Sequence, residues 1–279
     1  MSLTIFGAVD NCRWPGILYW HHSIRQAAPL ADIQLIAYRM DKPTADACRD
    51  HGITIHWREL AGRHVVVARF RDLPDILEGV EPDWAIFADV TDLVFQSNPE
   101  SWLAANLPAQ NKELVVQSEA IRYKDQSFDR LNMQECFPEH WGAMKNELVA
   151  NAGLIAGRPG AIGALSQDIF RLCRHRRVCW SNPDMAAMNV LLRQPEYHDR
   201  TLIANQAAGW CYCSAIYMSH PDERRKLLEP PAVLVDGLCL NTNGQPFSVL
   251  HHYTRDNAWR LAVESRIGKA IGLCPNHPD

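Results

Sequence analysis

An apolar run that ends abruptly on two carboxylates constrains this chain more than any other feature of its sequence. Residues Trp84-Ala-Ile-Phe-Ala88 have the length and composition of a buried strand in a parallel sheet. Asp89 and Asp92 follow where that strand should end. Because ligands of open α/β sheets bind outside the carboxyl ends of strands, we expect both acids to face a crevice. The alternative is that they cap the turn and the helix after it.

Strand-like and helix-like segments alternate along the first 117 residues. Strands are expected at 3–8, 33–38, 53–56, 84–88 and 114–117. Helices are expected at 17–28, at 44–51 with Thr44 near the N-cap, at 68–77 with an interruption at Pro74, and at 102–106. This alternation predicts an α/β fold with a mainly parallel central sheet flanked by helices. No repeat, low-complexity tract or linker divides the chain, so a single domain is expected.

The composition is that of an enzyme-sized globular protein. With 279 residues, 47% of them hydrophobic, the chain can bury one large core. A net charge of −4 argues against nucleic acid as a partner, and no apolar run approaches the ~20 residues of a transmembrane segment. The first residues, Met-Ser-Leu-Thr-Ile-Phe, lack the charged segment and cleavage site of a secretory signal, so none is expected. Nine cysteines, with Cys211 and Cys213 as the one close pair, are a weak zinc signal and favour inert thiols in a cytoplasmic protein.

Three short clusters in the second half place polar groups or glycines at the ends of predicted elements. Asn151-Ala-Gly153 begins a strand whose glycines serve either packing or close approach to a ligand. Asp184 lies in the first turn of a helix that holds Asn189 five positions later, and its simplest role is at the helix N-terminus. His251 and His252 end a late strand, and histidine is a common metal ligand.

The segment from Ile121 to Met144 has a weaker pattern, with many polar and aromatic residues. It is either a lid that faces an acceptor or a helical flank of the domain. The flank is the interpretation that we favour.

In their order along the chain, these motifs resemble those of the GT-A glycosyltransferases, nearest the glycogenin and bacterial galactosyltransferase-like group. Phe87-Ala-Asp89-Val-Thr-Asp92 falls where that group has its Asp-x-Asp metal motif. Ala68-Arg69-Phe70 with Leu73-Pro74 resembles the Tyr-Arg-Leu…Ile-Pro segment before it. Asn151-Ala-Gly153 resembles the Asn-Ser-Gly element of the group.

Two further motifs extend the likeness to most of the chain, from Arg69 to Trp259. Asp184…Asn189 has the spacing of the Asp-Gln-Asp-x-x-Asn element. His251…Trp259 matches the outer residues of the C-terminal His-x₇-Trp element. The order of the motifs, more than any single one, carries the resemblance.

The resemblance implies one GT-A-like, Rossmann-like domain over residues 1–279, with a nucleotide-binding half at 1–120 and a donor-sugar and acceptor half at 121–279. It implies an enzyme, a metal-dependent, hexosyltransferase-like glycosyltransferase. Such an enzyme moves a sugar from a nucleotide-diphosphate donor, here expected to be a UDP-sugar, to an acceptor hydroxyl. The acceptor stays open between a glycan, a lipid-linked glycan, a protein and a small molecule, because acceptor pockets are built from variable loops.

For the metal, the resemblance implies Mn²⁺ or Mg²⁺ held by Asp89, Asp92 and His251. Carboxylate oxygens suit these ions, which keep positions open for substrate phosphates. We favour His251 over His252 because its spacing to Trp259 matches the family element. Alternation along a strand would also put the two rings on opposite faces, so that only one reaches the ion.

For the donor, the resemblance implies a pocket beside the metal. The residues expected there are Arg69, Asp89, Asn151, Gly153, Asn189 and Arg255. Asp184 is the catalytic candidate, either binding donor-sugar hydroxyls or assisting the acceptor hydroxyl. The alternative for Arg69 is a surface ion pair with Asp72 on its own helix, an interaction that contributes little stability.

Departures from the family pattern keep a second function open. Thr91 stands where the second motif aspartate would fall, so Asp92 is expected to take its place. Met185-Ala186 replaces a Gln and an Asp, and Asn257 replaces a Lys, which leaves Arg255 to contact a phosphate. The alternative is therefore a catalytically degenerate nucleotide-sugar-binding or scaffold protein.

Other enzyme classes fit the sequence less well. A haloacid-dehalogenase-type phosphatase has Asp-x-Asp followed by Thr near the N-terminus, whereas Asp89-Val-Thr-Asp92 follows four predicted strands. No serine elbow, P-loop or glycine-rich dinucleotide fingerprint is present.

Overall fold

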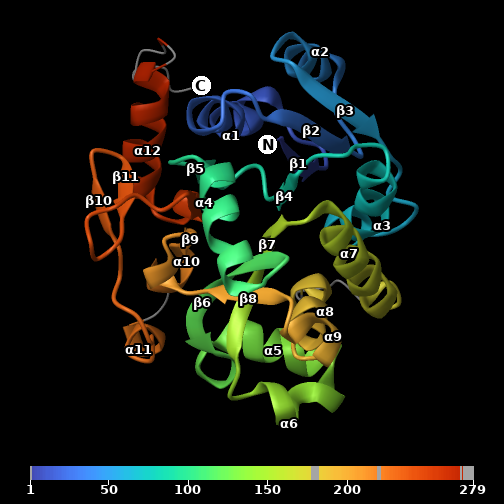
Figure 1. The fold of residues 1–279 in the computed structure, drawn as a ribbon, viewed down its shortest axis with the longest axis vertical. Coiled ribbons are helices and arrows are strands. Elements are labelled where there is room, and N and C mark those ends of the chain that lie inside the picture. The colour runs from blue at the N-terminus through green and yellow to red at the C-terminus, as the bar shows by residue number, and fades with distance from the viewer. Residues whose placement is uncertain (1, 177–181, 219–220, 271, 273–279) are drawn as a thin grey trace.

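A seven-stranded sheet runs through the centre of the molecule in the order β3-β2-β1-β4-β7-β6-β8 (Figure 1). The structure, a computed structural model, describes residues 2–176, 182–218, 221–270 and 272. The strands are β1 (Leu3–Val9), β2 (Asp32–Ala37), β3 (Ile53–Trp57), β4 (Trp84–Ala88), β6 (Leu114–Arg122), β7 (Leu148–Gly157) and β8 (Thr201–Ala204). Neighbouring strands pair in parallel except at β7, which is antiparallel to β4 and β6. The mainly parallel sheet is thus confirmed.

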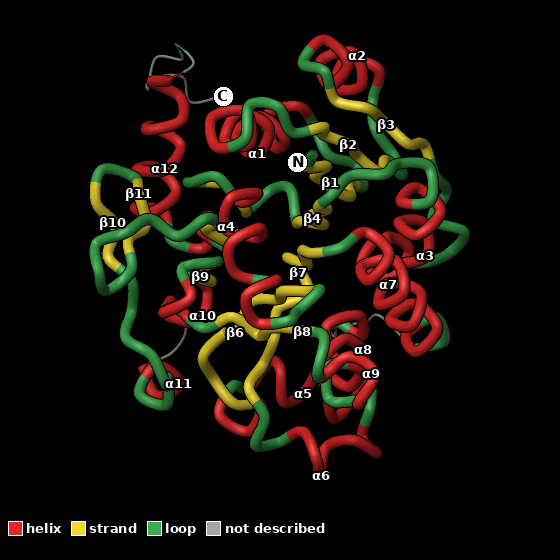
Figure 2. Tube along the Cα trace, in the orientation of Figure 1, coloured by secondary structure: helices red, strands yellow, loops and turns green. Residues whose placement is uncertain are grey.

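Helices lie on both sides of this sheet (Figure 2). The longer ones are α1 (Trp14–Ala27), α2 (Lys42–Asp50), α3 (Val65–Leu77), α4 (Pro99–Asn106), α5 (Ser127–Cys136), α7 (Pro159–Cys173), α8 (Pro183–Leu191) and α12 (Asn257–Ala270). Short helices are α6 (Trp141–Met144), α9 (Pro195–His198), α10 (Ala215–Met218) and α11 (Pro221–Arg224). No helix in the described ranges is long and apolar enough to cross a membrane.

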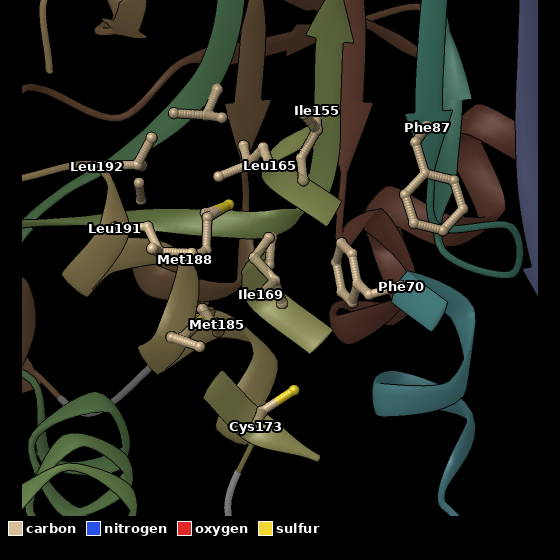
Figure 3. Close-up of a cluster of buried hydrophobic side chains, with 14 of the residues drawn as sticks. Phe70, Phe87, Ile155, Leu165, Ile169, Cys173, Met185, Met188, Leu191 and Leu192 are labelled. Carbon is tan, nitrogen blue, oxygen red and sulfur yellow. The ribbon is translucent and has the colours of Figure 1, made fainter. Parts of the chain in front are cut away.

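The strand β4 is buried on both faces because helices cover both sides of the sheet. Phe87 contributes to the core that α3, α7 and α8 cover, where it packs against Phe70 of α3 (Figure 3). Its neighbour Ile86 contributes to the opposite core, which contains Trp20 of α1 and Leu103 of α4. The strand therefore holds the acids that follow it at a rigid edge of the sheet.

One local prediction is wrong, the interruption at Pro74, and α2 begins two residues earlier than predicted, with Thr44 in its first turn. The helix α3 continues through Pro74 to Leu77, because burial of Leu73 and Leu77 stabilises the last turn although Pro74 has no N–H to donate. The N-cap of α2 is Asp41, whose carboxylate accepts a hydrogen bond from the amide of Thr44 over 2.9 Å.

A second, three-stranded sheet lies beside the first, with β12 (Val249–His251) between β5 (Leu93–Phe95) and β9 (Cys211–Cys213). The hairpin of β10 (Val233–Val235) and β11 (Leu238–Leu240) and the helix α12 lie on the same side of the molecule (Figure 1). In the three-stranded sheet, β12 pairs with β5 so that His251 lies opposite Leu93, the residue after Asp92. This pairing joins the end of the chain's last strand to the segment after β4.

Candidate active site

A cavity of about 680 Å³ lies over the carboxyl end of β4. This volume is typical of small-molecule sites. Most residues that the sequence predicts for the site line it, namely Arg69, Asp89, Asp92, Asn151, Gly153, Asp184 and Arg255. His251 lies directly behind the carboxylates, fully buried, and Asn189 lies outside the lining. The prediction that the acids face a crevice is confirmed.

Asp89 and Asp92 line this cavity, and His251 lies close to both of them beneath its surface. The Nε2 atom of His251 is 3.4 Å from Oδ2 of Asp89 and 3.7 Å from Oδ1 of Asp92. One donor atom from each of the three lies within 4.8 Å of the others. The pairing of β5 with β12 brings these side chains together. The same pairing is extended by a hydrogen bond from the amide of His252 to the carbonyl oxygen of Asp92 over 2.7 Å.

The electrostatics of this group favour a bound cation. Burial alone would lower the pKa of His251, but hydrogen bonding and charge from Asp89 and Asp92 raise its pKa to about 9. Burial opposes ionisation of Asp89, yet Arg69 and His251 hold its pKa below the usual range. Neither ring nitrogen of His251 has a hydrogen-bond partner that meets normal geometry within the described residues. Arg69 occupies Oδ1 of Asp89, and the remaining carboxylate oxygens with the imidazole form a donor set that fits Mn²⁺ or Mg²⁺.

Gly153 leaves room for this cluster. The last four residues of β7 pair antiparallel with β4, and just before them the carbonyl oxygen of Gly153 accepts a hydrogen bond from the amide of Asp89 over 2.7 Å. A Cβ atom on Gly153 would lie 2.4 Å from Oδ2 of Asp89 and 2.4 Å from Cε1 of His251. The glycine is therefore required by the contact between the carboxylate and the imidazole.

Replacing Gly153 by Ala should disrupt this contact, lowering the free energy of unfolding by about 1–3 kcal/mol, the usual effect of overpacking a buried site. Binding of Mn²⁺, followed by calorimetry, should weaken at least about 10-fold, which is a change of ~1.4 kcal/mol. Gly142→Ala is the matched control, because a Cβ there meets nothing within 4 Å. Equal stability and Mn²⁺ affinity in the two variants would contradict the assignment.

Arg69 bridges Asp89 and Asp184, two acids of the site that are far apart in the sequence. Its guanidinium donates to Oδ1 of Asp89 over 2.5 Å and to Oδ2 of Asp184 over 2.9 Å. The alternative of a surface pair between Arg69 and Asp72 is wrong, because Asp72 pairs with Arg71 and Tyr38 instead. Arg69 is held in place through its packing over neighbouring aromatic rings of the core.

Asp184 is buried at the first turn of α8 and lines the cavity. Burial raises the pKa of its carboxyl group, while Arg69 acts in the opposite direction. Its Oδ1 atom has no hydrogen-bond partner within the described residues.

The side chains of Asn151 and Asn189, which were predicted to contact the donor, form hydrogen bonds with the backbone. The amide of Asn151 donates to Oε1 of Glu119 over 2.6 Å, and its oxygen accepts from the amide of Gly153 over 2.7 Å. Asn189 exchanges two hydrogen bonds with the backbone of Ala150 and donates a third to Met185. Because its side chain is used in this way and lies outside the cavity, Asn189 does not contact a ligand there.

The expectation that the two adjacent histidines point to opposite faces is wrong. Strand β12 ends at His251, and His252 has a left-handed backbone with φ 61°. The two rings therefore lie side by side, with centroids 3.8 Å apart. Nε2 of His252 is 3.8 Å from Oδ2 of Asp92. Burial and the neighbouring His251 lower the pKa of His252 to about 3.

Two buried acids in the cavity wall, Glu119 and Asp129, were not predicted from the sequence. Burial raises the pKa of both carboxyl groups, and their proximity raises that of Asp129 further. Glu119 lies inside β6, two residues beyond the predicted end of that strand at Gln117. Asp129 is in α5, so the segment 121–144 forms part of the cavity wall and is more than the flank that we favoured.

Comparison with known proteins identifies the fold. No family model and no curated protein sequence matches this chain. Among solved structures, the galactosyltransferase LgtC in complex with donor and acceptor sugar analogues superposes with a TM-score of 0.62 and 13% identity, over 99% of this chain and 98% of its own. Mouse xyloside xylosyltransferase 1 superposes with a TM-score of 0.52 and 10% identity, over 90% of this chain and 97% of its own. The glycosyltransferase GlyE of Streptococcus pneumoniae TIGR4 superposes with a TM-score of 0.55 and 14% identity, over 97% of this chain and 63% of its own. The chain therefore has the GT-A fold of glycosyltransferases.

Proposed function

We propose that this protein is a metal-dependent glycosyltransferase that moves a sugar from a UDP-sugar to an acceptor hydroxyl. One observation carries the proposal. In a fold that glycosyltransferases share, Asp89 and Asp92 from one strand end meet His251 from a distant one at a cavity. The acceptor would be a glycan, a lipid-linked glycan or a small molecule.

Asp89, Asp92 and His251 would hold Mn²⁺ or Mg²⁺. Such an ion, when bound, offsets the negative charge that develops on the departing nucleoside diphosphate. Arg255 is exposed and lines the same cavity, so its guanidinium is available to a diphosphate oxygen as a second positive charge. The close approach that Gly153 allows would bring the backbone of β7 next to the donor sugar.

Asp184 would accept a hydrogen bond from a hydroxyl of the donor sugar through its unpartnered Oδ1. Arg69 would act as a positioning residue, because it fixes the other oxygen of Asp184 and one oxygen of Asp89. Met185 lines the cavity directly after Asp184, and its thioether is a poor partner for a sugar hydroxyl. This apolar side chain is the observation that favours the alternative, a protein that binds the nucleotide sugar without transferring it.

Thermal unfolding with a panel of nucleotide sugars tests donor binding. A UDP-sugar at about 100 times its dissociation constant should add ~2.7 kcal/mol of stability in the presence of Mn²⁺. A chelator, or the variant His251→Ala, should remove this gain, and GDP-sugars serve as the comparison for the base. Stabilisation by UDP-sugars that persists in the chelator would overturn the metal assignment. Release of UDP over time separates an enzyme from a binding protein.

A further inference from the structure

A second group of metal-ligating side chains lies next to the carboxylates, on the three-stranded sheet. Cys213 at the end of β9 is aligned with His251 at the end of β12, and the amide of Ser214 donates to the carbonyl oxygen of His251 over 3.0 Å. The left-handed backbone of His252 turns its ring back toward β9. As a result, Nδ1 of His252 lies 3.1 Å from Sγ of Cys213.

The geometry of this group suits a tetrahedral cation. One donor atom each of Cys213, His251 and His252 lies within 4.8 Å of the other two. Zn²⁺ binds sulfur at ~2.3 Å and imidazole nitrogen at ~2.0–2.1 Å, so two such ligands lie about 3.5 Å apart. The distance of 3.1 Å between Sγ and Nδ1 is within a few tenths of an ångström of that separation. A thiolate with two imidazoles selects Zn²⁺ over Mg²⁺ and Mn²⁺.

The imidazole of His251 is an independent indication of a ligand here. The residue is fully buried, and both ring nitrogens lack a hydrogen-bond partner among the residues that the structure describes. Nε2 faces the carboxylates of Asp89 and Asp92, but Nδ1 has no such neighbour among the interactions of the described residues, and a buried polar atom is normally paired. His252 lines the cavity, so the imidazole beside the Cys213 thiol borders the cavity.

We propose that Cys213, His251 and His252 bind a thiophilic divalent cation such as Zn²⁺, in competition with the cation of the neighbouring carboxylates. A metal–sulfur bond would replace the S–H bond of Cys213, and the proton would leave to solvent. Competition follows because His251 belongs to both groups and two dications this close repel each other. Inhibition of sugar transfer by Zn²⁺, which rests on the proposed function, is the expected consequence.

Cobalt(II) is the probe for the site, because a Co²⁺–thiolate bond absorbs in the near ultraviolet and Co²⁺ bound by oxygen and nitrogen alone lacks that band. The wild-type protein should show the band at one equivalent of Co²⁺, and Zn²⁺ should remove it. Cys213→Ser should lack the band. Cys211→Ser is the matched control and should keep it, because Cys211 is buried in the same strand with its thiol bonded to Gln117 over 3.0 Å.

Absence of the band in the wild type, or its persistence in Cys213→Ser, would overturn the proposal and leave a simple hydrogen bond between Cys213 and His252. His252→Ala gives a second test if Cys213→Ser does not fold. Calorimetry should show Zn²⁺ affinity falling at least 10-fold in either variant and in excess Mn²⁺.

A kinetic comparison separates this proposal from the proposed function. With activity normalised to each variant without Zn²⁺, the half-inhibiting Zn²⁺ concentration should rise at least 10-fold in Cys213→Ser relative to Cys211→Ser. Equal inhibition of both variants would overturn the site while the transferase function stands. A Co²⁺–thiolate band in a protein that transfers no sugar would establish the site and refute the function.

Discussion

Replacing Asp89 by Asn should lower the rate of UDP release from the donor by about 100- to 1000-fold, the usual effect of removing one group that stabilises developing charge. Asn has the same shape but lacks the charge that holds a cation beside Asp92 and His251. Arg69 keeps its bond to Asp184, so the variant should fold. Initial rates at saturating UDP-sugar and Mn²⁺ measure the effect, and a melting curve confirms folding.

Asp10→Asn is the control for this experiment. Asp10 lines the same cavity, but it forms an ion pair with Arg39, whose side chain is 65% exposed. A pair of this kind contributes under ~1 kcal/mol, so the control should fold and keep its rate within a few-fold. If Asp89→Asn turns over as fast as Asp10→Asn, the carboxylate of Asp89 does not hold a catalytic cation.

Replacing Arg69 by Ala should lower the free energy of unfolding by about 3–5 kcal/mol, the range measured when one partner of a buried ion pair is removed. The side chain of Arg69 is 11% exposed and that of Asp184 is 3% exposed, so the variant leaves a buried carboxylate without its cation. Arg69→Lys should lose less stability but still more than ~1 kcal/mol, because a single ammonium lacks the fork that reaches both acids. Urea unfolding measures both values.

The pH dependence of Arg69→Ala identifies Asp184 as the source of the loss. Burial already raises the pKa of Asp184, and removal of Arg69 should raise it further. A folded-state pKa above the unfolded value means that the folded protein binds more protons, so its stability falls as the pH rises between the two values. The loss should therefore be smaller near about pH 5 than near about pH 7.5.

Arg49→Ala provides the comparison for Arg69. Arg49 pairs with Asp46 on the surface of α2, with both side chains about half exposed. Its removal should change stability by less than ~1 kcal/mol and should show no comparable pH dependence. A loss in Arg69→Ala no larger than that in Arg49→Ala would mean that the bridge between Asp89 and Asp184 contributes little.

Local sequence patterns were sufficient for most elements of the sheet. The apolar run at Trp84–Ala88 is a strand with the predicted bounds, because a run of that length is buried on both faces of a parallel sheet. Predictions failed where tertiary packing outweighs local preference. Pro74 remains inside α3 because the residues around it are buried, and α5 forms a cavity wall although its sequence has no clear apolar period.

The residues that form the candidate site were harder to predict from the sequence than the strands of the sheet. Asp89 and Asp92 were evident because they end an apolar run, whereas Glu119 lies inside β6, after the polar residues Gln117 and Ser118. Asp129 and Cys213 carry no such signal, since a lone acid in a polar helix and a cysteine in a short apolar strand are both common. The role of Asn189 was misjudged because spacing along a helix does not tell which backbone atoms an amide reaches.

The sequence by itself determined the α/β alternation and the placement of carboxylates at the end of β4. Both depend on residues within a few positions of each other, where hydrophobic periodicity reports burial directly. Only the tertiary structure decided which distant groups meet. Arg69 reaches Asp184, 115 positions away, because α3, α7 and α8 pack together on one face of the sheet. His251 reaches Asp89 because β12 pairs with β5 in one register, and a shift of one residue would turn its ring to the opposite face.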